Sequence, residues 1–461
     1  MDNVSLESIQ RKINMCFTIY EKYSWLLNCY VLDFFTENHW NKILKNWQIS
    51  LGDLNSVEIS ELLNYDEQVR NKILPLSILA LKTILISSSL SRKMIDLKIE
   101  SPCFTQDEKL LKLFWKNVKA KKRHEISIMS KICYETAVKT DCFYIVDIGS
   151  GLGHLSRLLN YGYGFKVCTI EAQEVLSQQA KILDEEFETI LEKKFKGCLK
   201  YHKTVHINEK IQADVTVNEF LTIIKNAFNV DHDDFKFGIA GLHPCGDLGA
   251  TLLKLYNECS KAQFINIVGC CYMKLSTQPE STQGFPLSQF CKMNNYNLSY
   301  HSREIACHAI ENYVDKLKKD ECWRLKIHTY RAVLEKIIIN KYPDYHHCAL
   351  NNVKYTEDLS FRSYCQKATR KLNIDFSEDK LQSNEIDELL MQWKKVVVFY
   401  SLRLLFAPLV ESIILLDRLL YLKESGSNGK IAAVFDAKIS PRTHVLTAKK
   451  NLLTNDNTED F

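Results

Sequence analysis

The sequence predicts an α/β fold with a mostly parallel sheet, and three observations lead to this prediction. From about residue 140, short apolar runs alternate with helical segments. A glycine-rich turn at 149–153 directly follows the first of these runs. Two more short runs, at 431–435 and 444–449, stand near the end of the chain and would close the sheet as a hairpin. The 461 residues suffice for two or three domains.

Five strands are expected before the middle of the chain, because β-branched and aromatic residues gather in short runs that glycine or charged residues end. Between the first strands, one helix is expected to start at 155 and another to span 173–196. Strands that alternate with helices pair in parallel through right-handed crossovers. The expected strands are 143–148, 166–170, 203–207, 237–242 and 264–268.

The rest of the chain is predicted to form helices around this core. Apolar residues recur at spacings of three and four between Ile9 and Tyr20, and glycine is scarce in the first part of the chain. The domain prediction is an N-terminal helical domain at 1–117, a core at 118–275, a helical insertion at 276–395, a final helix and closing hairpin at 396–450, and a disordered tail at 451–461.

The composition is that of an ordinary globular protein, with 46% apolar and 25% charged residues and a net charge of +4. The first residues carry no secretory signal, so we expect reduced thiols and a cytoplasmic location, with the nucleus as a second possibility. The apolar stretch at 396–422 contains Arg403, Glu411 and Asp417. Each would cost about 2.5–3.5 kcal/mol at a bilayer centre, so we expect a buried helix and no membrane span.

Residues 147–154 read Asp-Ile-Gly-Ser-Gly-Leu-Gly-His and follow the first expected strand. Glycines allow positive φ and close approach to a ligand, and the start of the next helix favours an anion. Nucleotide dehydrogenases place their third glycine one residue later, where this chain has His154. The spacing therefore predicts the methionine carboxylate of S-adenosylmethionine, rather than a dinucleotide, at Gly149, Gly151 and Gly153.

Three acidic residues complete the predicted cofactor site. Glu171 ends the second strand about twenty residues past the loop, which suits a bidentate bond to ribose hydroxyls. Asp147 either receives the methionine amino group or braces the loop. Asp214 either accepts a bond from the adenine amino group or caps the next helix. We therefore predict an S-adenosylmethionine-dependent methyltransferase.

The methyl-transfer site is expected beyond the fourth and fifth strands, because ligands of open α/β sheets bind at the carboxyl ends of the strands. His243 and Asp247 follow the fourth strand and are candidates for proton removal or substrate orientation. The alternatives are a hydrogen-bonded turn for His243 and a helix cap for Asp247. Tyr272 follows the fifth strand and is the third catalytic candidate, expected to face the methyl group.

Four sulfur and nitrogen donors near these strand ends invite a metal interpretation. His243, Cys245, Cys270 and Cys271 are residue types that bind zinc. However, adjacent cysteines on a strand point to opposite faces, so both seldom bind one ion. We therefore predict no metal site.

Seven basic residues lie between 109 and 123, on an expected helix. They are either a solvated helix face or a positive rim for an anionic substrate. In the second case Lys121, Lys122, Arg123 and His124 would contact a protein or RNA substrate. Methyl transfer would then be an in-line displacement. The alternative function is a non-catalytic scaffold or RNA-binding protein with the same fold.

Several motifs of the chain resemble the methyltransferase-like 25 family. The resemblance implies a class I, Rossmann-like methyltransferase fold, but names no substrate. The strand count predicts a large insertion between strands 5 and 6 of this sheet. Amino-methylating adenine enzymes place Pro-Pro and an aromatic residue after the fourth strand, whereas 243–247 has one proline, which disfavours that chemistry. The matching motifs are 122–125, 147–157, 241–248, 268–275, 284–289, 303–309, 330–332, 407–411, 417–421 and 440–442.

Overall fold

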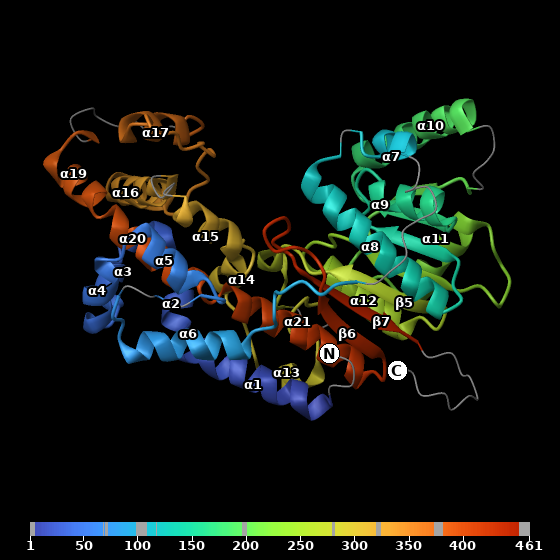
Figure 1. Ribbon diagram of the computed structural model, residues 1–461, viewed down its shortest axis with the longest axis horizontal. Helices are drawn as coiled ribbons and strands as arrows, with labels where there is room; N and C mark the ends of the chain where they lie inside the picture. Colours follow the sequence, from blue (N-terminus) through green and yellow to red (C-terminus); the bar gives the residue numbers. More distant parts are fainter. Residues whose placement is uncertain are drawn as a thin grey trace. The chain divides into compact units, whose positions relative to one another are not determined.

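The computed structural model describes residues 5–450 apart from a few gaps, and its chain divides into two compact units (Figure 1). The first unit comprises Met1–Phe17, Ser91–Leu298 and Glu411–Phe461, and the second Thr18–Leu90 and Ser299–Val410. The tail predicted at 451–461 lies outside the described residues. The gaps are 68, 70, 71, 98–107, 117, 196–200, 279–281, 320–323 and 373–380.

The first unit is built on a seven-stranded sheet with the order β3-β2-β1-β4-β5-β7-β6 (Figure 1). The first five strands are parallel, and β7 is antiparallel to both of its neighbours, β5 and β6. Each strand lies at the place predicted for it within three residues. The strands are β1 (Tyr144–Ile148), β2 (Lys166–Glu171), β3 (Val205–Asn208), β4 (Phe237–Gly241), β5 (Ala262–Val268), β6 (Asn428–Ala433) and β7 (His444–Lys449).

Helices cover both faces of this sheet, which explains why β4 and β5 are buried along their whole length. Helix α8 (Ala120–Lys139) and helix α12 (Leu248–Glu258) both contact β5. The buried side chains beneath α8 form one core with β1 and the end of β6. The other helices of this unit are α1 (Leu6–Lys22, which begins here), α7 (Glu108–Phe114), α9 (His154–Arg157), α10 (Glu174–Phe195), α11 (Val217–Phe228), α13 (Gln289–Met293) and most of α21 (Ala407–Glu424).

The basic helix predicted through 109–123 is wrong, because α7 ends at Phe114 and α8 begins only at Ala120. The side chain of Arg123 explains how the break is stabilised. Its Nε and Nη2 donate to the carbonyls of Val118 and Trp115 at 2.6 and 2.9 Å. The carbonyl of Trp115 also accepts the N–H of Val118 at 3.1 Å, so Arg123 ties the first turn of α8 to a turn that is itself hydrogen-bonded.

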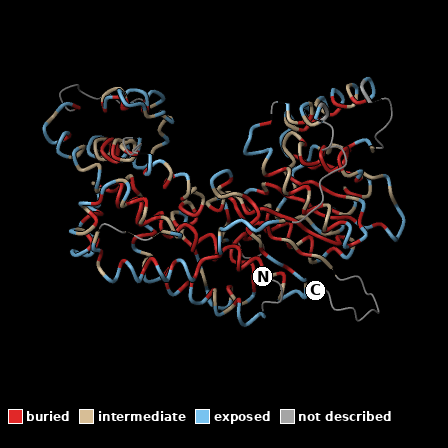
Figure 2. Tube along the Cα trace, viewed as in Figure 1, coloured by how far each residue is buried: buried red, intermediate tan, exposed pale blue. Residues whose placement is uncertain are grey.

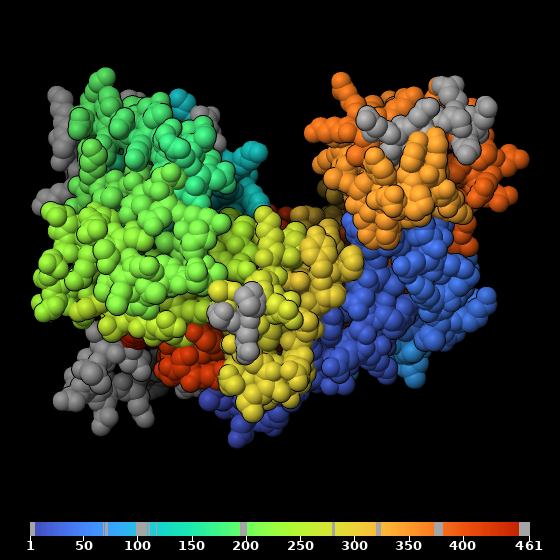
Figure 3. Space-filling model, turned by 180° about the vertical axis from the view of Figure 1, so that it is seen from behind, coloured from blue at the N-terminus to red at the C-terminus, as the bar shows by residue number. Residues whose placement is uncertain are grey.

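The described residues of the second unit form helices joined by loops, without a strand. Helix α5 (Ser56–Leu63) contacts α15 (Ile310–Lys318), and each presents a buried apolar face. Figure 3 shows the early part of this unit, in blue, beside its later part, in gold and orange. The other elements are α2 (Ser24–Leu27), η1 (Val31–Phe34), α3 (His39–Lys42), α4 (Lys45–Gly52), α6 (Leu76–Ser88), α14 (Tyr300–Ile305), α16 (Lys326–Lys341), η6 (Pro343–Tyr345), α17 (Phe361–Ala368), α19 (Asn384–Met391) and α20 (Trp393–Leu404).

This unit corrects the predicted domain boundaries. The sequence prediction separated 1–117 from 276–395, whereas most of both segments lies in this one unit. The reason is the apolar face of α5, which the chain buries against a helix about 250 residues further on. Sequence periodicity identifies such a face but not the face that covers it.

Among the described residues, one apolar helical stretch, Trp393–Glu424, is long enough to cross a membrane. Its most apolar part is completely buried inside the protein (Figure 2). The charged residues within it have partners there: the guanidinium of Arg403 donates to the carbonyl of Leu27, and Asp417 accepts two backbone N–H bonds. This burial is that of a core helix.

Candidate functional site

The loop after β1 has the backbone that its glycines predict. Gly149, Gly151 and Gly153 have φ values of 71°, 58° and 68°. A Cβ atom at Gly151 would meet no atom within 4 Å, so this residue borders open space. The N–H of Gly149 donates to the carbonyl of Ile170 at 2.8 Å, which fixes the loop to β2. The loop therefore offers a tightly bent backbone with room for a ligand.

Glu171 stands at the end of β2, directly beside this loop. Its Oε2 accepts the N–H of Gly151 and its Oε1 accepts the N–H of Gln173, both at 2.9 Å. The residue is only 8% exposed. Each carboxylate oxygen has a second lone pair, so both can still accept from a hydroxyl group. The structure thus brings together two parts of the predicted cofactor site, which are twenty residues apart in the sequence.

Asp147 braces the segment that follows the loop, which is one of its two predicted roles. Its Oδ2 accepts the hydroxyl of Ser156 at 2.6 Å. Burial raises the pKa of Asp147 to about 6. The segment itself departs from the predicted helix, because α9 continues as a π-helix over Leu158–Gly162. The carboxylate of Asp147 therefore holds α9 in place, just before the irregular π-helical turn.

Asp214 lies in an exposed turn between β3 and α11. The suggested helix cap is wrong, because the side chain of Thr216 caps α11 by accepting the N–H of Glu219. No such local role accounts for Asp214, and its predicted bond to adenine stays a prediction.

A buried ion pair that the sequence did not reveal supports the same loop. The guanidinium of Arg157 bonds Oδ1 of Asp184 at 2.6 Å, and Nε2 of His206 lies 2.9 Å from the other oxygen. These residues join α9, α10 and β3. Burial, together with the charge of Arg157, lowers the pKa of His154 to about 4, so that ring is neutral. No sequence spacing marks this network, because its partners are brought together by the sheet.

His243 pairs with a carboxylate on α8. Its Nε2 lies 3.0 Å from Oε2 of Glu125, which is 1% exposed and also accepts the hydroxyl of Ser440. Burial alone would raise the pKa of Glu125, but the bonds from His243 and Ser440 outweigh it and lower the pKa. Burial opposes ionisation of His243, yet the neighbouring Cys270 and Glu125 raise its pKa to about 9. A ring in this state is poorly suited to accept a proton.

The side chains of the other two predicted catalytic residues, Asp247 and Tyr272, also form hydrogen bonds with protein groups. Oδ1 of Asp247 accepts the N–H of Ser276 at 2.7 Å, and its side chain makes no cap bond to α12. Tyr272 is 1% exposed, and its hydroxyl donates to Oε1 of Glu411 at 3.0 Å. Burial raises the pKa of Tyr272 well above its usual value. The structure therefore places Tyr272 in the interior rather than facing an open site.

The four predicted substrate contacts have different surroundings. Lys121 lies 3.6 Å from Glu125, Arg123 bonds the carbonyls between α7 and α8, and the ring of His124 accepts the N–H of Asp436. Lys122 is exposed, and its charge acts on Asp147 and His154. Of the four, Lys122 is thus the one whose charge reaches the glycine loop.

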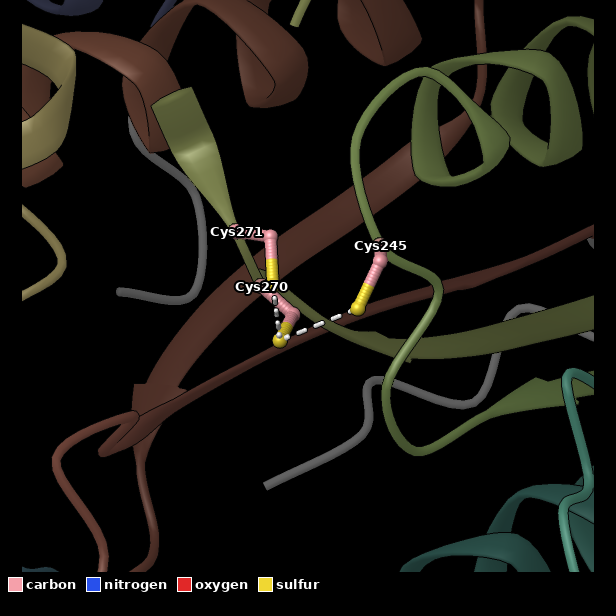
Figure 4. Close-up of side chains that lie close together, drawn as sticks. All are labelled: Cys245, Cys270 and Cys271. Carbon is pink, nitrogen blue, oxygen red and sulfur yellow. Dashed lines mark hydrogen bonds between the residues drawn. The ribbon is translucent and has the colours of Figure 1, made fainter. Parts of the chain in front are cut away.

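Three cysteines meet where β4 and β5 end (Figure 4). The sulfur of Cys270 lies 3.5 Å from that of Cys245 and 3.5 Å from that of Cys271. The expectation that the adjacent cysteines point apart is wrong, because β5 ends at Val268 and Cys271 has a positive φ of 48°. The left-handed backbone ends the alternation of side chains on which that expectation rested.

The family model described as a methyltransferase domain matches residues 121–278. This segment is therefore similar to known methyltransferase domains. It contains the glycine loop, Glu171 and the three cysteines, and the sheet order built around it is the one that the predicted fold requires. The mixed seven-stranded sheet therefore confirms the predicted α/β class.

Curated relatives confirm the resemblance to the methyltransferase-like 25 family. The chain is 32% identical over 225 residues to probable methyltransferase-like protein 25 of Homo sapiens, covering 46% of this chain and 36% of the relative. It is 29% identical over 252 residues to the Mus musculus protein of that name, covering 51% of this chain and 41% of the relative. The chain thus spans about two fifths of the length of these relatives.

Solved structures give a weaker likeness. The plantazolicin methyltransferase BpumL in complex with SAH has 9% identity and a TM-score of 0.23, over 75% of this chain and 91% of that chain. The fold assignment rests on the strand order and the family model instead.

Proposed function

We propose that this chain is an S-adenosylmethionine-dependent methyltransferase. The observation that carries the proposal is the glycine loop, where Glu171 bonds Gly151 beside open space. The methionine carboxylate would lie against the backbone of Gly149, Gly151 and Gly153, and the ribose hydroxyls against Glu171. The match of 121–278 to a methyltransferase domain supports this cofactor.

The chemistry would be an in-line displacement of the methyl group from sulfur. Such a reaction gains most of its rate from alignment of the nucleophile, the methyl group and the sulfur. Asp247 and Cys245 lie at the carboxyl end of β4, where a substrate would approach the cofactor. We assign Asp247 a positioning role, because its carboxylate holds the backbone of Ser276.

The substrate would be a macromolecule, protein or RNA, in the cytoplasm or the nucleus. Exposed lysines of the first unit support this proposal: Lys116 and Lys119 lie between α7 and α8, and Lys122 near the glycine loop. Clustered positive charge attracts an anionic polymer or an acidic protein surface. The similarity of the motifs to the methyltransferase-like 25B branch is part of this proposal.

A second candidate function is a non-catalytic scaffold that keeps the cofactor site. The observation in its favour is that His243, Asp247 and Tyr272 each bond a protein partner. Both the enzyme and the scaffold would bind the cofactor, but only the enzyme would transfer methyl groups.

Two measurements on the full chain test the proposal. First, S-adenosylhomocysteine at about 100 times its Kd should stabilise the fold by about 2.7 kcal/mol, whereas NAD should not. Second, tritiated methyl groups should pass from S-adenosylmethionine into an extract of cells that lack the protein. Digestion of the labelled extract with RNase or protease separates the two substrate classes.

The matched control is Gly151→Val, because a branched side chain strains a residue with a φ of 58° and fills the open space. This variant should bind neither S-adenosylhomocysteine nor S-adenosylmethionine, and it should transfer no methyl groups. Stabilisation by NAD but not by S-adenosylhomocysteine contradicts the proposal. Cofactor binding without transfer into any fraction supports the scaffold instead.

A further inference from the structure

We propose that His243, Cys245, Cys270 and Cys271 bind a zinc ion. This site goes beyond the proposed function and does not depend on it. Thiolate sulfur together with imidazole nitrogen is the donor set that zinc prefers in structural sites. The ion would join the loop after β4 to the loop after β5.

The sulfur atoms already have nearly the spacing that zinc requires. All three lie within 4.8 Å of one another, and two of the separations are 3.5 Å. A tetrahedral site with Zn–S bonds of about 2.3 Å places its sulfurs roughly 3.8 Å apart. A disulfide would instead need about 2.05 Å. The positive φ of Cys271 turns its sulfur toward that of Cys270, at the conformational cost of a left-handed backbone in a non-glycine residue.

His243 interacts with Cys270 and is the candidate for a fourth ligand, although the group of donor atoms within 4.8 Å of one another comprises the three cysteines alone. Its Nε2 bonds the buried carboxylate of Glu125, and its Nδ1 is buried without a hydrogen-bond partner among the described residues. Cys270 is close enough to interact with the ring electrostatically. A carboxylate that holds one ring nitrogen while the other faces the metal is the usual arrangement around metal-bound histidine. This pairing also explains why Glu125 is buried on α8.

The charges around the cluster favour an anionic metal site. Zinc with three thiolates and a neutral imidazole carries one net negative charge. The guanidinium of Arg418, 1% exposed, acts on Cys270, and the ammonium group of Lys274 acts on Cys245 and Cys271. Binding would release the three thiol protons and any proton on Nδ1 to solvent. With four protein ligands the ion has no open position, so its role would be structural.

A second group of metal-binding residue types lies in the helical unit and differs in one respect. Asp33, Glu335, His346 and His347 also lie within 4.8 Å of one another. There, however, Nε2 of both histidines bonds Asp33, at 3.1 and 2.9 Å. The imidazole nitrogens that face this group are therefore already engaged, whereas Nδ1 of His243 is not.

The test is the zinc content of the full-length protein, purified without chelators and measured by mass spectrometry. The wild-type chain should hold about one zinc ion, and Cys245→Ser and Cys270→Ser should lose most of it. Cys245 is exposed, so its replacement removes a ligand without disturbing the core. Cobalt exchanged into the wild-type protein should show thiolate-to-metal charge transfer and the visible bands of a tetrahedral ion.

Two control variants separate this site from other thiols and from the second cluster. Cys307→Ser should keep the metal, because that half-buried thiol donates to the carbonyl of Arg303 in α14, and His347→Ala should keep it as well. A wild-type protein that takes up neither zinc nor cobalt overturns the proposal. So does metal that survives both cysteine variants and disappears with His347→Ala. Binding of S-adenosylhomocysteine, measured on the same samples, tests the proposed function separately.

Discussion

The two halves of the predicted site differ in how their side chains are held. In the half formed by β1 and β2, Glu171 bonds backbone N–H groups of the glycine loop and of Gln173, within twenty residues of itself. In the half formed by β4 and β5, His243 bonds Glu125, which is 118 residues away, and Tyr272 bonds Glu411, 139 residues away. The first half is therefore organised by local backbone geometry and the second by distant partners.

This difference assigns different roles to residues that the sequence made equal candidates. Carboxylates that hold loop backbone beside open space can also accept hydroxyls from a ligand. Side chains that satisfy buried partners far along the chain stabilise the fold, and their removal leaves those partners unpaired. Substitutions in the first half should therefore change the affinity for the cofactor. Substitutions in the second half should instead change the stability of the protein or its zinc content.

The largest expected effect is that of Glu171→Ala on the affinity for S-adenosylhomocysteine. The variant loses a charge-assisted contact to the ribose and the bond that orders Gly151, about 1.5–3 kcal/mol, or at least tenfold in Kd. Titration calorimetry measures it. Glu174→Ala removes an exposed charge nearby and should leave Kd unchanged. Equal affinities in the wild-type and Glu171→Ala proteins would remove the first half from the cofactor site.

Tyr272→Phe should show the opposite pattern in the second half. Loss of the hydroxyl leaves Oε1 of Glu411 without its donor in a buried place, at a cost of about 1–3 kcal/mol in the free energy of unfolding. Urea unfolding should show this loss, with the cofactor Kd unchanged. Tyr300→Phe, at a tyrosine that is 54% exposed, is the control for stability. A normal stability together with impaired methyl transfer would return Tyr272 to the catalytic set.

Asp147 gives the first half a dependence on pH. Its folded-state pKa of about 6 lies above the unfolded value of about 3.9, so the folded protein binds this proton more tightly. The stability that this proton contributes is therefore lost as the pH rises from about 4 to about 6, by at most about 3 kcal/mol. Asp147→Asn keeps an acceptor for Ser156 and should abolish this contribution. Parallel pH profiles of unfolding for the two proteins would show that Asp147 does not titrate in this range.

The smallest effect is expected for Asp247→Asn. The amide oxygen can still accept the N–H of Ser276, so methyl transfer should fall only a few-fold and cofactor affinity should not change. Initial rates on the labelled substrate fraction measure this. A loss of about 10²-fold or more with intact folding would instead identify Asp247 as the proton acceptor.

The sequence predicted what depends on local pattern. All seven strands, the glycine loop and the neighbouring Glu171 follow from runs of residues and their spacing. It did not predict the helical unit made from 18–90 and 299–410, because periodicity does not reveal which apolar faces meet. It also misjudged Cys270 and Cys271, because a left-handed residue directly after a strand reverses the expected direction of a side chain. Glu125 belongs to a matching motif but received no predicted role, since its partner His243 is set by tertiary structure.

The most direct test of the account is calorimetric titration of the wild-type chain with S-adenosylhomocysteine, and separately with NAD. We predict saturable binding of S-adenosylhomocysteine at one site, its loss in Gly151→Val, and no heat with NAD. Binding that persists in Gly151→Val would place the ligand away from the glycine loop. No binding of S-adenosylhomocysteine to the folded wild-type protein would contradict the account.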